Sequence, residues 1–399
     1  MTGSVKGALV NTGAKPSVVL VSPKTLLPRF WSTAWSVGLA GKSLAANTLK
    51  IRMRHLGAFY GFCDESFGDD SLDAVLSNRD VQMLRRMVEA FYLHLTEAKT
   101  YTSTTVQRWD AVRVFVADVL RQLAVGIDEL YLLSSSIQSI GRIREPQRGG
   151  FKFARALPGA TLKDLLVVAD PSSTRNPAKD YRVRWRNWLI VHLLLLVGLR
   201  RGEVLLLSID SLKQDVDSET GEWVRWLDVT TTEDEDSRAT RPSIKTAESH
   251  RQVPVSEDLA ILYERYVSEY RVPSENHAFL LTARGGAPLS AESVNTMLEG
   301  LTEALGDSEK ARFHERTGGK KHISPHDLRH TCATARYRAF IQHQPDRELA
   351  LQRMRAFFGW SVKSTMPDLY ARAAIQDDLV RTWNVLFDER VQNLRGVMP

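Results

Sequence analysis

The chain has 399 residues, of which 43% are hydrophobic and 25% charged, and its formal net charge is +6. This composition excludes a mostly disordered chain, and the length allows about two domains. The modest positive charge is compatible with a polyanionic partner but does not require one. The two cysteines, Cys63 and Cys332, are far apart in sequence. They offer neither a zinc-binding spacing nor a disulfide framework, which is typical of a reducing compartment.

The first third of the chain is predicted to be a loose tail followed by helices. Residues 1–25 are rich in Gly, Ser, Thr and Lys, and nothing in them resembles a secretory signal. Residues 26–135 are predicted to form a small all-helical domain. The pattern is clearest over 104–123, where apolar residues recur at helical spacing and arginines fall largely outside the apolar stripe. We therefore expect this domain to present basic faces.

Residues 136–159 combine basic side chains with prolines and glycines, which favours a linker. Two interpretations stay open for it: a solvated connector, or a strap that lies along a phosphate backbone. The candidates for DNA binding in this linker are Arg142, Arg144, Arg148, Lys152 and Arg155.

Residues 160–399 are predicted to be helical with a small antiparallel sheet, so the fold class is mainly α (α+β). Strand-like runs occur at Trp223–Thr230 and Arg251–Val255, and Ser243–Lys245 is expected to form a hairpin with the second run. The apolar run Trp188–Leu199 is too short to span a bilayer and predicts a buried helix. Helices are expected near 161–169, 181–198, 257–270, 290–305, 325–341, 347–358 and 376–390.

The segment that begins at Pro325 places a histidine and an arginine on one face of a predicted helix. Pro325 suits the first turn, and His326 and Arg329 are three residues apart. A guanidinium and a proton-transfer group aimed at one place suit a phosphate oxygen. His330 follows His326 at a spacing also used by zinc sites, but the glutamate of the protease motif and a clear third ligand are missing.

Four further side chains are candidates for phosphate chemistry. Arg200 follows the buried helix with Glu203 nearby, so it belongs either to a structural ion pair or to a phosphate site. Lys245 could donate a proton to a leaving oxygen, although a solvated lysine is the simpler interpretation. Trp360 offers an uncharged N–H donor, and Tyr370, on a short segment after a proline, offers a hydroxyl.

Together these residues resemble the tyrosine recombinase, or phage-type integrase, family over roughly residues 159–380. His-Asp-Leu-Arg-His-Thr and Gly-Leu-Arg-x-Gly-Glu are near matches to the two arginine motifs of that family. Trp360 stands where many members have histidine, and Tyr337 is the alternative nucleophile. The catalytic set implied by the resemblance is Arg200, Lys245, His326, Arg329, Trp360 and Tyr370, with Glu203 in support and His330 as a packing neighbour.

The resemblance implies a site-specific DNA recombinase or integrase. Tyr370 would attack a backbone phosphate and form a 3′-phosphotyrosyl bond, while His326 accepts or relays its proton. The two arginines would hold the non-bridging oxygens, and Lys245 would protonate the departing 5′ oxygen. Because the covalent link conserves the energy of the phosphodiester, no cofactor, ATP or metal is expected.

The resemblance also implies partners and a setting. The partner would be double-stranded DNA, bound by a homotetramer, and accessory or directionality proteins would be further possible partners. The protein would act in the cytoplasm, at the bacterial nucleoid. A mobile genetic element would carry the gene. The amphipathic segment Ala374–Pro399 would pack either on its own domain or on a neighbouring protomer. The alternatives are a type IB topoisomerase-like enzyme and a catalytically silent DNA-binding relative.

Overall fold

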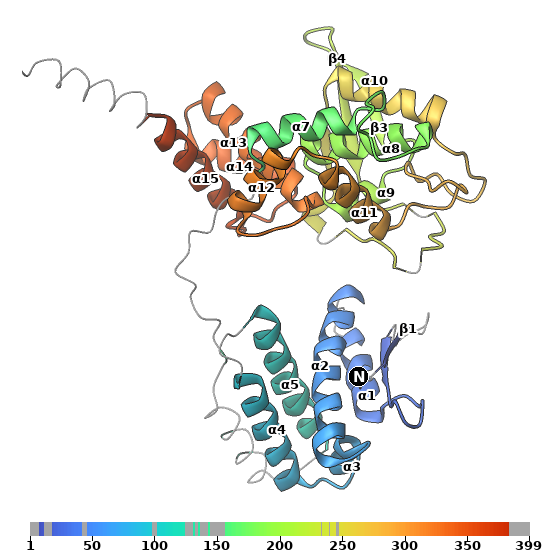
Figure 1. Ribbon diagram of the computed structural model, residues 1–399, viewed down its shortest axis with the longest axis vertical. Coiled ribbons are helices and arrows are strands. Elements are labelled where there is room, and N and C mark those ends of the chain that lie inside the picture. The colour runs from blue at the N-terminus through green and yellow to red at the C-terminus, as the bar shows by residue number, and fades with distance from the viewer. Residues whose placement is uncertain are drawn as a thin grey trace, which may run out of the picture. The chain divides into compact units, whose positions relative to one another are not determined.

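The structure is a computed structural model that divides into two compact units, Met1–Gly150 and Phe151–Pro399 (Figure 1). Within the residues it describes, no helix has the length and apolar character needed to cross a membrane. The described residues are 8–11, 18–41, 46–97, 102–123, 131, 135, 143, 156–232, 234–238, 240–244 and 247–382.

The described part of the first unit is a bundle of helices around one hydrophobic core. The apolar stripe predicted over 104–123 is buried there, with Trp109, Val112 and Phe115 inaccessible to solvent. Thr102 caps the helix that carries this stripe, because its side chain accepts a hydrogen bond from the backbone N–H of Thr105. The helices are α1 (Phe30–Gly41), α2 (Ala46–Phe67), α3 (Ser71–Ser77), α4 (Val81–Thr96) and α5 (Ser103–Gln122).

A β-hairpin joins this bundle where we expected a loose tail over residues 1–25. Strands β1 (Ala8–Asn11) and β2 (Val18–Val21) pair antiparallel. All four residues of β2 are buried aliphatic side chains, and aliphatic β-branched residues favour strands. Leu20 packs so closely on α2 that a side chain at Gly57 would press against it. The glycine- and serine-rich composition of the tail concealed this short apolar strand.

The predicted linker falls largely outside the described residues. Of residues 136–159, the structure describes 143 and 156–159. Both linker interpretations therefore stay predictions, as do the DNA contacts of Arg142, Arg144, Arg148, Lys152 and Arg155.

The sheet of the second unit differs from the predicted hairpin. Strand β5 (Arg251–Pro254) pairs with β4 (Trp223–Val229), and β4 pairs with β3 (Leu212–Val216), all antiparallel. Residues 243–244, expected to pair with β5, are not in a strand. Apolar side chains of β4 and β5 are buried in the core, which fixes their register. β3 escaped prediction because most of its side chains are exposed and lack apolar alternation.

The helices of the second unit follow the sequence pattern closely, with three exceptions. The short helix α9 (Arg201–Leu206) has no predicted counterpart. The segment before Pro325 contains an unpredicted polar helix, and the last helix begins at Met366 rather than near residue 376. A proline is tolerated in the first turn of a helix, so Pro367 does not interrupt it. The helices are α7 (Gly159–Ala169), α8 (Tyr181–His192), α9 (Arg201–Leu206), α10 (Glu257–Arg265), α11 (Ala291–Glu303), α12 (Asp307–Thr317), α13 (Pro325–His343), α14 (Arg347–Phe358) and α15 (Met366–Thr382).

Helix α13 is central to the part of this unit that carries the candidate site. It lies against α14 and α15 (Figure 1). It also contacts the π-helical turn η1 (Leu193–Val197), which continues α8. Pro325 occupies the predicted first turn, and Asp327 and Ser324 cap it reciprocally. These contacts bring together segments that are far apart in the sequence.

Candidate active site

Two glycines shape the ends of the helices at the site. η1 ends at Gly198 with φ 64°, and α14 ends at Gly359 with φ 60°. A side chain at Gly198 would clash with the Phe358 ring, and one at Gly359 would reach within 2.9 Å of the Ser249 Cα. Both positions therefore require glycine for its backbone conformation and for the close approach of neighbouring segments.

Glu203, in the first turn of α9, lies at the centre of three arginines. Only 2% of the residue is exposed. Its carboxylate lies 2.5 Å from Nη1 of Arg200, 3.0 Å from Nη2 of Arg251 and 3.7 Å from Nη1 of Arg329. Burial alone raises the pKa of this carboxyl, but Arg251, Arg329 and Arg200 outweigh burial and hold the pKa below its usual value. We call these four residues the arginine cradle.

Arg329 is the most deeply buried arginine of the cradle, with 2% exposure. It donates hydrogen bonds to the backbone carbonyls of Gly198 and Phe358, and its guanidinium lies over the Phe358 and Trp360 rings. Burial lowers its pKa to about 9, and Arg200 adds to that shift while Glu203 opposes it. The group therefore stays charged at neutral pH.

Arg200 is the more accessible of the two predicted arginines, with 26% of its side chain exposed. Its guanidinium donates to the hydroxyl of Ser249 at 3.1 Å and to the carbonyl of Gly359 at 3.4 Å. Its backbone N–H donates to Glu203 at 2.8 Å. The sequence left open a structural ion pair or a phosphate site. This geometry contains the ion pair and leaves about a quarter of the Arg200 side chain exposed.

Arg251 is a member of the cradle that the sequence analysis missed. Its Nε donates to the carbonyl of Phe357 at 2.8 Å, and Nη1 donates to the carbonyl of Ser249 at 2.8 Å. It thereby fastens β5 to the end of α14. One signal was available: in a strand, Arg251 shares a face with Val253, which is fully buried, so a charged side chain pointed inward.

Tyr370 lies beside the cradle in a stack of aromatic rings. Its ring is nearly parallel to that of Trp360, with centroids 5.4 Å apart and an interplanar angle of 10°. Trp360 stacks in turn on Phe358, with centroids 4.7 Å apart. The Tyr370 hydroxyl lies 2.5 Å from Nδ1 of His330, and the residue is 2% exposed. We call Phe358, Trp360 and Tyr370 the aromatic stack.

The two histidines of α13 have different surroundings. His326 is exposed, whereas His330 is 6% exposed and contacts Tyr370. Their rings meet edge to face, with centroids 4.5 Å apart. His330, expected to be a packing neighbour, thus contacts the predicted nucleophile. The zinc alternative needs a third ligand, and no group of three His, Cys, Asp or Glu side chains suited to a metal occurs among the described residues.

Two further predicted residues have different outcomes. Lys245 falls outside the described residues, so its role stays a prediction. Tyr337, the alternative nucleophile, is 5% exposed and packs in the hydrophobic core of the second unit. The structure therefore groups five of the six predicted catalytic residues around α13, which are Arg200, His326, Arg329, Trp360 and Tyr370.

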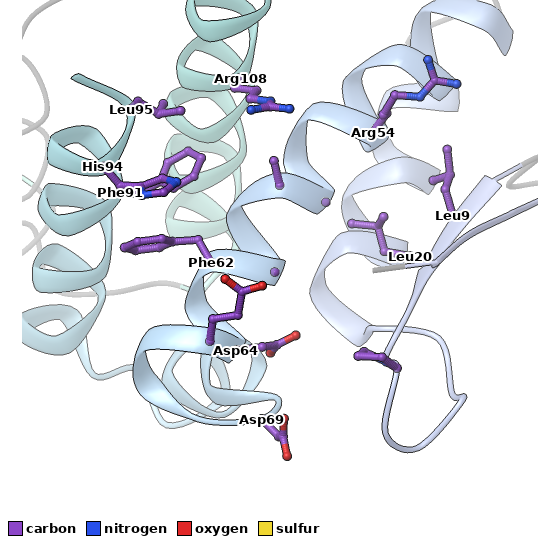
Figure 2. Close-up of a pocket in the computed structure, with 15 residues that line it drawn as sticks. Leu9, Leu20, Arg54, Phe62, Asp64, Asp69, Phe91, His94, Leu95 and Arg108 are labelled. Atoms are coloured by element: carbon purple, nitrogen blue, oxygen red, sulfur yellow. The ribbon is translucent and has the colours of Figure 1, made fainter. Parts of the chain in front are cut away.

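A separate pocket of about 560 Å³ lies in the first unit (Figure 2). Arg54 and Arg108 lie toward one end of it, and Asp64 and Asp69 lie toward the other (Figure 2). Phe91 and other apolar side chains form part of its lining. Because opposite charges line its two ends, it is not a uniformly basic surface of the kind that follows a phosphate backbone.

The comparisons with known proteins place this geometry in a class. The second unit is mainly helical with one small three-stranded antiparallel sheet, as the sequence predicted. The phage integrase family model matches residues 176–376, which include the cradle and the stack. The chain belongs to this family, which confirms the resemblance.

Several solved structures of recombinases are similar to the chain, and no curated protein matches it. A XerH site-specific recombinase bound to palindromic difH substrate, in a post-cleavage complex, is 15% identical with a TM-score of 0.49, covering 89% of this chain and 84% of that chain. The XerA recombinase is 16% identical with a TM-score of 0.37, covering 88% and 97%. A lambda integrase dimer bound to a COC′ core site is 14% identical with a TM-score of 0.40, covering 85% and 93%.

Proposed function

We propose that this chain is a site-specific DNA recombinase that uses Tyr370 to cleave and rejoin DNA through a 3′-phosphotyrosyl intermediate. One observation supports this above all: a tyrosine hydroxyl lies beside a cluster of three guanidiniums that share one carboxylate. The cluster therefore carries an excess of positive charge. Such a site suits the pentacovalent phosphorane-like transition state, which carries more negative charge than the starting phosphodiester.

The cleavage step assigns a role to each group. Tyr370 Oη attacks the phosphorus, and Arg200 and Arg329 stabilise the non-bridging oxygens. Arg200 meets the DNA first because it is the more exposed of the two. His326, which is exposed and contacts the His330 ring, relays a proton or donates to the phosphate. Trp360 forms the wall against which the Tyr370 ring rests.

The remaining parts of the proposal come from the family resemblance. Lys245 protonates the 5′ oxygen as it leaves, so the phosphodiester energy is kept in the tyrosine link and no cofactor is consumed. The basic linker follows the DNA backbone. Four protomers bring two sites together and exchange strands in two steps. A mobile genetic element carries the gene, and accessory proteins set the direction of the reaction.

The covalent adduct provides the direct test. A binding site is first selected from a pool of random duplexes with the wild-type protein. The selected duplex is then nicked on the 3′ side of the scissile phosphate, so that the short fragment with the free 5′ hydroxyl diffuses away after cleavage. We expect wild-type protein to form an adduct that survives denaturing electrophoresis. Tyr370→Phe should bind the same duplex and form no adduct, because it lacks the attacking oxygen.

Tyr337→Phe is the matched control, because it removes the hydroxyl of a buried tyrosine on the neighbouring helix. It should keep the adduct, and the reverse pattern would make Tyr337 the nucleophile. If the wild type bound its site without ever forming an adduct, the chain would be a silent DNA-binding relative. Relaxation of supercoiled plasmid irrespective of a recombination site would instead identify a topoisomerase-like enzyme.

A further inference from the structure

His330 contacts the hydroxyl of the proposed nucleophile directly, yet the mechanism above gives it no role. The distance between Tyr370 Oη and His330 Nδ1 is 2.5 Å, which is short for a hydrogen bond to a hydroxyl. Both residues are buried, with 2% and 6% exposure. A buried imidazole in contact with a phenol is placed to take its proton, because geometry is the first requirement for a general base.

The two residues are held in this contact from both sides. His330 is fixed by α13, whose first turn is capped by Ser324 and Asp327. Tyr370 is fixed by α15 and by the Trp360 ring, which lies nearly parallel to its own. The phenol therefore has little freedom to turn away from the imidazole without breaking the stack.

The different surroundings of His326 and His330 also suggest different roles for them. His326 lies one helical turn before His330, on the exposed side of the same helix face, with the two rings edge to face. Arg329, adjacent to His330 in sequence, interacts electrostatically with Tyr370. A guanidinium there stabilises the phenolate oxygen as it develops charge. The exposed histidine is left for the incoming phosphate, and the buried one for the phenol.

We propose that His330 Nδ1 is the group that accepts the proton of Tyr370 during DNA cleavage. This inference rests on the proposed function. In the tautomer of the neutral imidazole that carries its hydrogen on Nε2, Nδ1 accepts the hydrogen bond of the Tyr370 hydroxyl. As the Oη–P bond forms and the P–O5′ bond breaks, the phenol proton moves to Nδ1, and the 5′ oxygen takes a proton from the proposed acid Lys245. In rejoining, the 5′ hydroxyl attacks the phosphorus and returns its proton to Lys245. The Oη–P bond breaks, and His330 returns its proton to Oη.

The test uses the substitution His330→Asn in the full-length protein on the nicked duplex described above. An asparagine side chain can place an amide group near the position of Nδ1 and keep a hydrogen bond to the phenol, but it cannot accept a proton. With saturating protein and DNA in a single turnover, we expect adduct formation to slow by roughly 10²–10⁴-fold, the usual contribution of a general base. Binding of the duplex should be unchanged.

A second measurement separates proton acceptance from positioning. Site-specific incorporation of a trifluorotyrosine at position 370 supplies a more acidic phenol, which depends less on a base. We expect this change to restore much of the lost rate in His330→Asn and to give no comparable gain in His326→Asn. Equal effects of the fluorinated residue in the two variants, or a wild-type rate in His330→Asn, would overturn the inference.

Two controls keep the outcomes distinct. Thermal melts identify a variant that fails to fold, in which case His330→Gln, which also offers an amide but with a longer reach, replaces it. Tyr370→Phe is run in parallel: an adduct in that variant contradicts the proposed function itself. No adduct in Tyr370→Phe together with full activity in His330→Asn contradicts only the assignment of His330.

Discussion

The arginine cradle and the aromatic stack lie side by side but are held by different forces. Each arginine of the cradle forms an ion pair with Glu203 and donates hydrogen bonds to backbone carbonyls or hydroxyls of other segments. The stack is held by ring contacts and by the hydrogen bond between Tyr370 and His330. The charged groups are therefore held by a network of ion pairs and hydrogen bonds, whereas the proposed nucleophile Tyr370 is held by weaker, shorter-range contacts. We expect changes in the cradle to cost stability and changes in the stack to cost mainly activity.

Glu203→Ala should have the largest effect on stability. It leaves three buried or half-buried guanidiniums without their shared carboxylate, and removing one partner of a buried ion pair costs about 3–5 kcal/mol. Urea denaturation followed by tryptophan fluorescence measures the loss. Glu203→Gln keeps the shape and one of the two acceptor oxygens, so it should lose less stability than Glu203→Ala. An unchanged midpoint in Glu203→Ala would contradict the central position of this carboxylate.

Arg251→Lys should be the next most damaging change. Lysine keeps the charge but cannot reproduce the planar fork that bonds Glu203, Phe357 and Ser249 together. We expect a loss of about 1.5–3 kcal/mol, the usual contribution of a hydrogen bond to a charged group, together with slower adduct formation.

Arg225→Lys is the matched control for Arg251→Lys. Arg225 belongs to the adjacent strand β4, and its partner Glu257 is largely exposed, at a distance of 3.3 Å. Exposed ion pairs contribute little, so its stability should change by no more than about 1 kcal/mol. Equal losses in the two variants would show that Arg251 has no special place in the cradle.

Trp360→Phe tests the stack. The smaller ring keeps an aromatic surface against Tyr370 but fills less of the space, and aromatic pairs contribute about 0.5–1.5 kcal/mol beyond their burial. We expect a modest loss of stability and a proportionally greater loss in the rate of adduct formation, because the phenol gains freedom. A loss of stability as large as that of Glu203→Ala would remove the contrast between cradle and stack.

Protonation of Glu203 at low pH should change the stability of the protein less than any of the substitutions above. The pKa of Glu203 is lower in the folded protein than its usual value of 4.5, so the unfolded chain binds the proton more tightly. The resulting stabilisation is complete above that value and is lost as the pH falls toward the lower, folded pKa. Thermal melts between pH 3 and 6 should show a shallower decline for Glu203→Gln than for the wild type.

Local sequence patterns determined much of this protein. Apolar spacing predicted the helix over 104–123, and Pro325 predicted the start of α13, because these features depend on neighbours within one or two turns. The resemblance gave the family, which the family model confirms. Patterns failed where a segment was short or polar, as in the strands β1, β2 and β3.

Contacts between distant segments were decided only by the tertiary structure. The Arg251 side chain points inward because it pairs with Glu203 and with the end of α14. No local sequence pattern specifies such partners. Likewise, the contact between Tyr370 and His330 depends on how α15 packs against α13. The sequence by itself determined which chemical groups are available. Packing decided which of them meet, because a contact made across a core depends on the whole arrangement of helices around it.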